Sequence, residues 1–170
     1  MDINELNGLL KKGYGGRELT SFYSGNIDAL LKSIFSAAFE PSRSHAKLFL
    51  IAVGGYGRGD LAPFSDIDIM LFARDRSAAG TAKELLYKFW DSKLDISHSF
   101  RTPSDCIDES KRDIRTRTSL LEHRYVAGDK ELYSYFRENV YPEVAFRNQK
   151  RFVMEKLREA TTMVKIPVFE

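Results

Sequence analysis

The sequence predicts an α/β domain in which a small mixed sheet is flanked by helices and followed by a helical extension. Two short apolar runs, residues 48–53 and 69–73, lie on either side of a glycine-rich turn, and short apolar runs bounded by turn residues are typical of buried strands. Around these runs, apolar residues recur at intervals of three and four, which is typical of amphipathic helices. The predicted order is helix, strand, strand, helix, strand and then a helical tail.

Residues 1–45 are predicted to form an N-terminal helical segment. Four glycines within residues 1–16 indicate a short helix followed by a flexible stretch. Across residues 17–39 the apolar spacing predicts one amphipathic helix, which Gly25 can interrupt. A loop at residues 41–45 is expected to lead into the first strand.

Residues 46–102 are predicted to form the core of the domain, and residues 103–170 a helical extension. The composition changes after Thr102 and Pro103, where a boundary is expected. The core is predicted to contain strands at residues 46–53, 66–73 and 93–100 and a helix at residues 81–92. The extension is predicted to contain helices at residues 104–112, from 118 to near 128, at 129–139 and at 143–163.

The composition excludes several classes of protein. A chain of 170 residues with a net charge of +2 can build a core but carries too little charge to predict a nucleic-acid or membrane partner. No apolar run approaches the ~18 residues of a membrane span, and the first residues lack a signal-peptide pattern. The single cysteine, Cys106, excludes an internal disulfide and fits a reducing compartment, so we expect a cytoplasmic protein.

The glycine turn, residues 54–59, has the sequence GGYGRG. Glycine lets phosphate oxygens approach backbone N–H groups closely because no Cβ stands in the way. The turn is not a P-loop, since no Lys-Ser/Thr pair follows it, and it lacks the third glycine of a dinucleotide fingerprint. On its own, the turn is equally consistent with a tight connection between two elements.

Asp66 and Asp68 add a second feature, because they lie at the head of the second predicted strand. Alternation places both carboxylates on one face of the strand and Ile67, Ile69 and Leu71 on the other, which we expect to face the core. Carboxylates beside an apolar strand are costly unless they are paired or bind a metal, and two carboxylates one pleat apart suit a hard divalent cation.

Other classes of protein that carry two aspartates in this spacing fit less well. Haloacid dehalogenases have a threonine where this sequence has Met70, and an EF-hand loop would continue with more oxygen ligands. A glycosyltransferase would not require the glycine turn upstream.

The third predicted strand offers another carboxylate. Alternation places Asp95, Ser97, Ser99 and Arg101 on one face, so Asp95 is expected beside Asp66 and Asp68, with Arg101 further along the same side. A third carboxylate is expected where two metals support an in-line displacement. The alternative, that Asp95 is a solvated strand residue, stays open.

Three stretches in the same order resemble the amino-terminal domain of the bifunctional PII uridylyltransferase/uridylyl-removing enzymes. They are GGYGRGDLAPFSDIDIMLF at residues 54–72, WDSKLDISHSFRT at residues 90–102 and TSLLEHRYVAGDKELY at residues 118–133. These enzymes are part of the nucleotidyltransferase superfamily that includes DNA polymerase beta. The resemblance therefore implies a polymerase beta-like nucleotidyltransferase fold.

The resemblance also implies roles for particular residues. Gly54 and Gly55 would contact the triphosphate of UTP, and Ser65 would be a hydrogen-bonding residue beside it. The residues themselves add two candidate substrate-binding cations, Arg58 in the glycine turn and Arg101 on the third predicted strand. The metal ligands for Mg²⁺ would be Asp66, Asp68 and Asp95, and Asp95 would also act as the base. The implied reaction is transfer of UMP from UTP to a tyrosine hydroxyl of the PII nitrogen-signal protein, with release of pyrophosphate.

The sequence departs from the family in several respects. Full-length members are several times longer and continue into an HD hydrolase domain and two ACT domains, so we expect an excised fragment or a short relative without uridylyl removal or glutamine sensing. Asp95 stands where the family often has Glu, and Ser97 where it usually has Gly. Two alternatives remain open: transfer of another nucleotide or to another acceptor, such as protein adenylylation, and a non-catalytic nucleotide-binding or interaction module.

Other side chains are expected to be structural. His98 and Trp90 lie in apolar patterns and are predicted to be core residues. Cys106 has no activating partner in the sequence and is predicted to be an ordinary helix residue. A basic stretch predicts a solvated helix face, with contact to the triphosphate or to the acceptor as the alternative. It consists of Lys111, Arg112, Arg115, Arg117 and Arg124.

Overall fold

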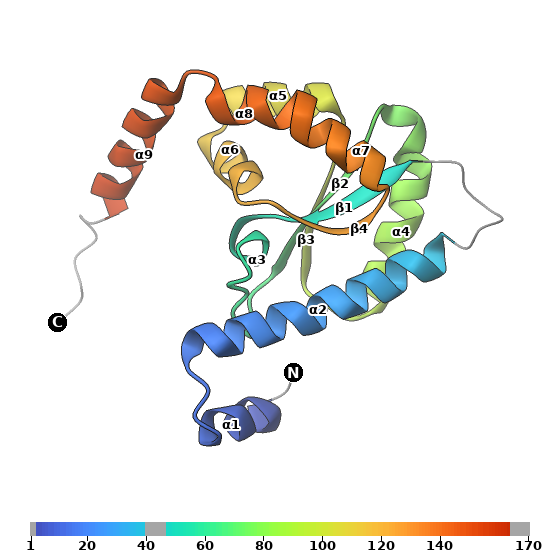
Figure 1. Ribbon diagram of the computed structural model, residues 1–170, viewed down its shortest axis with the longest axis vertical. Coiled ribbons are helices and arrows are strands. Elements are labelled where there is room, and N and C mark those ends of the chain that lie inside the picture. The colour runs from blue at the N-terminus through green and yellow to red at the C-terminus, as the bar shows by residue number, and fades with distance from the viewer. Residues whose placement is uncertain (1–2, 40–46, 164–170) are drawn as a thin grey trace.

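The computed structural model describes residues 3–39 and 47–163. The predicted loop at residues 41–45, the first residue of the predicted first strand and the start of the predicted first helix lie outside the described residues. The elements that form the layers around the sheet are shown in Figure 1. The two N-terminal helices are α1 (Ile3–Lys11) and α2 (Gly16–Ala38).

Four strands form one mixed sheet, which confirms the predicted fold class. The strand order is β3-β2-β1-β4. Strand β1 pairs antiparallel with both β2 and β4, whereas β2 and β3 run parallel. The strands are β1 (Leu48–Ala52), β2 (Ile67–Ala73), β3 (Ile96–Arg101) and β4 (Arg124–Gly128).

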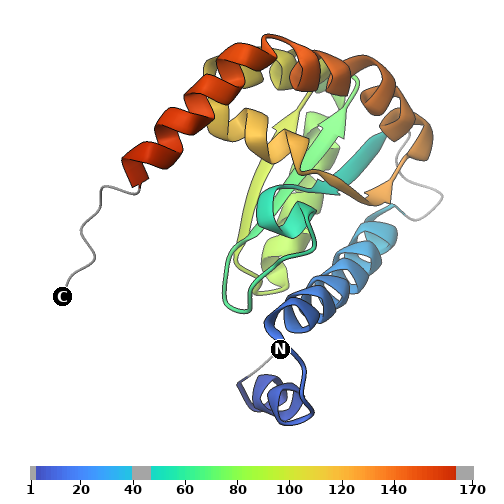
Figure 2. The ribbon, with the colours of Figure 1, turned by 60° about the vertical axis from the view of Figure 1, so that its left-hand side comes forward.

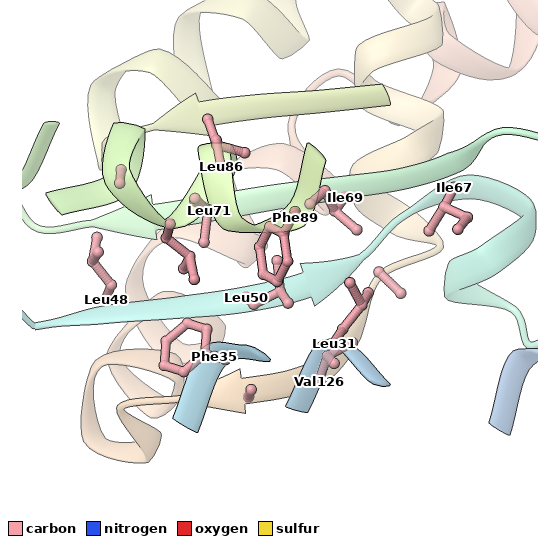
Figure 3. Close-up of a cluster of buried hydrophobic side chains, with 14 of the residues drawn as sticks. Leu31, Phe35, Leu48, Leu50, Ile67, Ile69, Leu71, Leu86, Phe89 and Val126 are labelled. Carbon is pink, nitrogen blue, oxygen red and sulfur yellow. The ribbon is translucent and has the colours of Figure 1, made fainter. Parts of the chain in front are cut away.

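One face of the sheet is covered by α2 and α4 (Ala79–Asp91), which follows the 3₁₀ turn η1 (Arg76–Ala78). Figure 3 shows the core of this layer, where Leu31 and Phe35 of α2 and Phe89 of α4 meet Leu50 of β1. Helix α2 is continuous through Gly25, because the buried residues of its inner face hold it on the sheet.

The opposite face is covered by the C-terminal helices (Figure 2). Phe49 and Phe72 are partners in the β1–β2 register and stack with ring centroids 4.8 Å apart, and Phe136 packs edge-on against both. Both faces of the sheet are therefore buried, whereas the sequence pattern had assigned the core to one face. The covering elements are α5 (Pro103–Arg112), α6 (Ile114–Leu121), α7 (Lys130–Tyr135), η2 (Phe136–Val140) and α8 (Tyr141–Phe146).

The predicted helix from residue 118 to near residue 128 is wrong in its second half. Helix α6 ends at Leu121, and residues 124–128 form β4 at the edge of the sheet. Pairing with β1 decides the structure of this segment, because Tyr125 and Val126 fit a pleated surface and the sheet supplies partners for their backbone. The sheet thus takes its fourth strand from the segment predicted as a helical extension.

The last predicted helix, residues 143–163, is interrupted. Asn148 has a left-handed backbone, with φ of 48°, and it separates α8 from α9 (Gln149–Met163). Asparagine tolerates this conformation better than most residues. Among the helices of the described residues, none combines the length and apolar character that crossing a bilayer requires.

Gly128→Ala is expected to destabilise the protein by about 3 kcal/mol. Gly128 has φ of +108°, and a Cβ there would overlap the carbonyl oxygen of Leu48 and lie 2.7 Å from Cα of Phe49. Neither backbone atom can move without disturbing β1. Urea unfolding measures the change.

The matched control is Gly25→Ala in α2, where a Cβ would meet no atom within 4 Å. Alanine there is expected to raise the free energy of unfolding by about 0.5–1 kcal/mol, because glycine is unfavourable inside a helix. Equal effects of the two substitutions would contradict the packing described for Gly128.

Candidate functional site

The glycine turn follows the end of β1, and its first four residues form a short helical turn, α3 (Gly54–Gly57). It lies between α2 and α6 at one end of the sheet (Figure 1). Gly54 has a left-handed backbone, with φ of +58°, which a residue with a Cβ adopts only at a cost. The turn is fixed to the sheet because the Val53 N–H donates to the carbonyl oxygen of Asp68 over 3.1 Å.

Asp68 lies against the glycine turn, although 13 residues separate it from Gly54 in the sequence. A Cβ at Gly54 would be 3.6 Å from Oδ2 of Asp68. The antiparallel β1–β2 register, in which Ala52 is opposite Ile69, produces this approach. The structure therefore brings together the predicted phosphate-binding turn and one predicted metal ligand.

Asp66 is exposed and lies directly before β2, one pleat from Asp68. Burial raises the pKa of the Asp68 carboxyl, and the negative charge of Asp66 raises it further. Within the described residues, neither carboxylate has an ion-pair or side-chain hydrogen-bond partner. Two uncompensated carboxylates beside a glycine turn form a site that a cation would stabilise.

Asp95 lies beside the start of β2, because its carbonyl oxygen accepts a hydrogen bond of 2.8 Å from the Ile67 N–H. The parallel register then pairs Ile67 with Ile96 and Asp68 with Ser97. However, no group of three or more His, Cys, Asp or Glu side chains in the described part of the chain is arranged to hold a metal ion. The role of Asp95 as a third ligand stays a prediction.

The structure does not bring Arg101 to the carboxylates. Arg101 is at the far end of β3, opposite Phe72, and it is six positions after Asp95, which is about 20 Å along an extended strand. Its guanidinium forms an ion pair with Glu109 of α5, with an N–O distance of 2.8 Å. The length of the strand therefore places Arg101 away from the site.

Arg58 lies at the turn, and its positive charge is already paired. Its Nη1 atom is 2.6 Å from a carboxylate oxygen of Glu122, and Nε is 3.2 Å from Asp60. The predicted cation therefore holds the turn to the end of α6. If the guanidinium contacted a phosphate, it would interact with that phosphate and with the two carboxylates at the same time.

Ser65 shapes the loop that leads to the carboxylates. Its Oγ donates a hydrogen bond of 2.8 Å to the carbonyl oxygen of Ala62, and its N–H donates to the same oxygen. The loop is fixed at its other end by Leu61, whose N–H donates to Oγ of Ser24 on α2. In this structure Ser65 positions the chain immediately before Asp66.

A partly buried polar network that was not predicted from the sequence fixes the glycine turn. The hydroxyl of Tyr56 donates to Asp28 of α2 over 2.6 Å, and Arg124 of β4 donates to the same carboxylate over 3.0 Å and to the carbonyl oxygen of Tyr56 over 3.3 Å. Burial, and then the bond to Asp28, raise the pKa of the Tyr56 hydroxyl, so it stays protonated as a donor. The three residues join α2, α3 and β4.

Gly57 is required by a close approach of α6 to the turn. A Cβ at Gly57 would overlap the carbonyl group of Glu122, the residue that follows α6. The family resemblance implied Gly54 and Gly55 as the phosphate contacts. The tightest steric requirement falls instead on Gly57, through a contact that only the folded chain shows.

Several residues predicted to be structural differ from the prediction in their exposure. Trp90 is 45% exposed, and it contacts the exposed His98 edge-on, with ring centroids 5.2 Å apart. They are not core residues because β3 is an edge strand of the sheet, where α4 leaves part of the face uncovered.

Cys106 is buried, and burial raises the pKa of its thiol to about 12, which fits an inert residue.

The predicted basic stretch is not one solvated face. Arg124 belongs to the partly buried network of Tyr56, and Arg117 is buried. Lys111 pairs with Asp108 on the same helix, with an N–O distance of 2.7 Å. These cations therefore serve different parts of the structure.

Tyr56→Phe is expected to lower the free energy of unfolding by about 1–2 kcal/mol, because it removes a donor from the partly buried Asp28. The matched control is Tyr23→Phe on α2, whose hydroxyl has no hydrogen bond within the described residues. It is expected to change stability by less than about 0.5 kcal/mol. Urea unfolding of both variants measures the difference, and equal losses would contradict the network.

Asp68→Asn is expected to stabilise the metal-free protein at pH 7. Because the pKa of Asp68 is raised in the folded state, its ionised form opposes folding. This opposition is present above the folded-state pKa and is lost as the pH falls below the unfolded-state value. The gain from Asp68→Asn should therefore shrink between pH 7 and pH 3.5 in urea unfolding. A gain that is constant with pH would contradict the charge repulsion.

Comparison with known proteins places the chain in a family. Residues 33–126 match the nucleotidyltransferase domain family. The bifunctional uridylyltransferase/uridylyl-removing enzyme of Erythrobacter litoralis (strain HTCC2594) is 34% identical over 160 residues, which cover 89% of this chain and 17% of the relative. The enzyme of the same description from Phenylobacterium zucineum (strain HLK1) is 35% identical over 160 residues, covering 88% of this chain and 17% of the relative.

The chain thus spans about one sixth of the length of these curated relatives. Among solved structures, a toxin–antitoxin crystal structure with AMP-PNP matches with a TM-score of 0.45 and 15% identity, covering 78% of this chain and 98% of that chain. The family match includes the glycine turn, Asp66 and Asp68. The chain belongs to the nucleotidyltransferase domain family.

Proposed function

We propose that this chain is a Mg²⁺-dependent nucleotidyltransferase that transfers UMP from UTP to a tyrosine hydroxyl of a PII-type signal protein. The observation that carries the proposal is the contact of Asp68 with the glycine turn, where a Cβ at Gly54 would be 3.6 Å from the carboxylate. This contact supports a site in which phosphates and a cation are bound side by side.

The glycine turn supports triphosphate binding. Neither Gly54 nor Gly55 has a side chain to block the backbone amides, and the turn is fixed by the Tyr56 network and by the end of α6. A fixed turn binds phosphate with little loss of conformational freedom on binding. Arg58 would place a partly compensated positive charge beside it.

The carboxylates fit a divalent cation. Asp66 and Asp68 lack partners among the described residues, and burial together with the charge of Asp66 raises the pKa of Asp68. When bound there, Mg²⁺ would neutralise charge on the triphosphate. Asp66 and Asp68 would hold it, and Asp95, beside the start of β2, would complete the ligand set.

The proposed reaction is a displacement at the α-phosphorus of UTP. The tyrosine oxygen forms a bond to this phosphorus, and the bond to the oxygen that bridges to the β-phosphate breaks, so pyrophosphate leaves. The proton of the tyrosine hydroxyl passes to the carboxylate of Asp95. The contribution of the protein is positioning and charge stabilisation.

The relatives support the choice of nucleotide and acceptor. They are described as uridylyltransferase/uridylyl-removing enzymes and match this chain at 34–35% identity. Uridylyl transfer is the activity that we assign to this segment, because it contains the glycine turn and the aspartates. We do not assign uridylyl removal to it.

The first test is calorimetric titration of the chain with UTP and with ATP, in the presence and absence of Mg²⁺. We expect UTP to bind in a Mg²⁺-dependent manner, with at least about tenfold weaker binding to Asp68→Asn, because a ligand of the cation is lost. The matched control is Asp91→Asn, at the exposed end of α4, which should bind as the wild type does. A preference for ATP would contradict the assignment of UTP, and Mg²⁺-independent binding would contradict the metal site.

A second test measures transfer of labelled UMP to a PII protein. Asp68→Asn and Asp95→Asn are each expected to lower the rate by about 100-fold or more, because one loses a metal ligand and the other the base. Unchanged transfer by Asp95→Asn would remove Asp95 from the mechanism. If the wild-type chain binds UTP but does not transfer UMP to the PII protein, this result would contradict PII as the acceptor.

A further inference from the structure

A hollow of about 480 Å³ lies between α5, α6, α8 and α9. None of the residues assigned to the nucleotide site lines it. Its volume is within the range of small-molecule sites in proteins, roughly 300–1,000 Å³. Helix α6 begins at this hollow and ends at the glycine turn, so the two places are at opposite ends of one helix.

The lining of the hollow is rich in cations. Three carboxylates also line it, but each has a partner. Glu143 lies 3.6 Å from Arg147, and Glu155 lies 2.7 Å from Arg151. Asp113 accepts hydrogen bonds from two backbone amides in the first turn of α6. The cationic side chains are Lys111, Arg112, Arg117, Arg147 and Arg151.

Two of these cations have no carboxylate partner. In the part of the chain that the structure describes, no carboxylate oxygen is within 4.0 Å of the guanidinium nitrogens of Arg112 or Arg117. Arg112 is exposed at the end of α5, whereas Arg117 is only 8% exposed. The lining therefore carries five cationic and three carboxylate side chains, and two of the cations lack a direct carboxylate partner among the described residues.

Arg117 is the best-fixed of these groups. Its Nη2 atom donates to the carbonyl oxygens of Ala145 and Arg147, over 3.1 and 2.7 Å, and its guanidinium lies 4.3 Å from the ring centre of Phe152. Its Nε atom is buried and has no acceptor. Burial lowers the pKa of the Arg117 guanidinium, while Glu155 acts in the opposite direction.

A buried guanidinium without a carboxylate in direct contact is costly, because arginine stays charged at all accessible pH values. The two carbonyl oxygens explain how Arg117 connects α6 to the end of α8. They carry no formal charge, however, and they leave the Nε donor unused. An anion in the hollow would bring a negative charge into direct contact with the guanidinium, which the more distant Glu155 does not do.

We propose that this hollow is a binding site for a small oxyanion, a carboxylate- or phosphate-bearing molecule, held by Arg112 and Arg117. Guanidinium groups form short, charge-assisted hydrogen bonds with such oxygens. The exposed Arg112 meets the ligand at the opening and the buried Arg117 meets it inside. The proposal does not depend on the nucleotidyl transfer reaction.

The test is calorimetric titration of the full chain with inorganic phosphate and with citrate, without divalent cations. We expect at least one anion to bind to the wild type, and Arg112→Gln to weaken that binding about tenfold or more. The anion that binds more tightly identifies the class of ligand. Arg117→Lys keeps the charge but changes the donor geometry, so it should also weaken binding.

The matched control is Arg115→Gln. Arg115 is on α6, the helix of Arg117. Its side chain is 82% exposed, and it does not line the hollow. This variant should bind the anion as the wild type does, and circular dichroism should show all three variants folded. Two results would overturn the proposal: no binding of either anion by the folded wild type, or binding that Arg112→Gln and Arg115→Gln weaken equally.

Discussion

The ion pair between Arg124 and Asp28 is the interaction on which the geometry of the nucleotide site depends. It joins an edge strand of the sheet to α2, and the same two side chains hold the hydroxyl and the carbonyl group of Tyr56. A partly buried pair of this kind adds specificity only if all its groups are satisfied. In this network the Asp28 carboxylate and the hydroxyl and carbonyl groups of Tyr56 all have partners. The glycine turn is therefore held in one position relative to β2, and Gly54 meets Asp68.

The carboxylates occupy the end of a sheet that is otherwise buried on both faces. Helices α2 and α4 cover one face and the C-terminal helices cover the other, but within the described residues neither layer supplies a partner for Asp66 or Asp68. Burial, and then the charge of Asp66, raise the pKa of Asp68, so its ionised form opposes folding at neutral pH. A stable, doubly covered sheet can tolerate this local cost, and a bound cation would remove it.

The parts of the structure that could be predicted from the sequence are those set by local patterns. The apolar runs predicted β1 and β2, and the glycines predicted the turn between them. Strand β4 was missed because its structure depends on pairing with β1, about 75 residues away in the sequence, and the Tyr56 network was missed for the same reason. The distance along β3 separates Arg101 from the site. Trp90 was expected in the core, and its exposure follows from β3 being an edge strand, which periodicity cannot show.

The most direct test of the central claim, that the glycine turn and the carboxylates form one metal–nucleotide site, is paramagnetic broadening of backbone amide signals by Mn²⁺ in the presence of UTP. We expect the amides of Gly54, Gly55, Asp66 and Asp68 to broaden first. The amide of Arg101, at the far end of β3, should keep its intensity and serves as an internal control. Broadening that spares the glycine turn, or that affects Arg101 equally, would contradict the account.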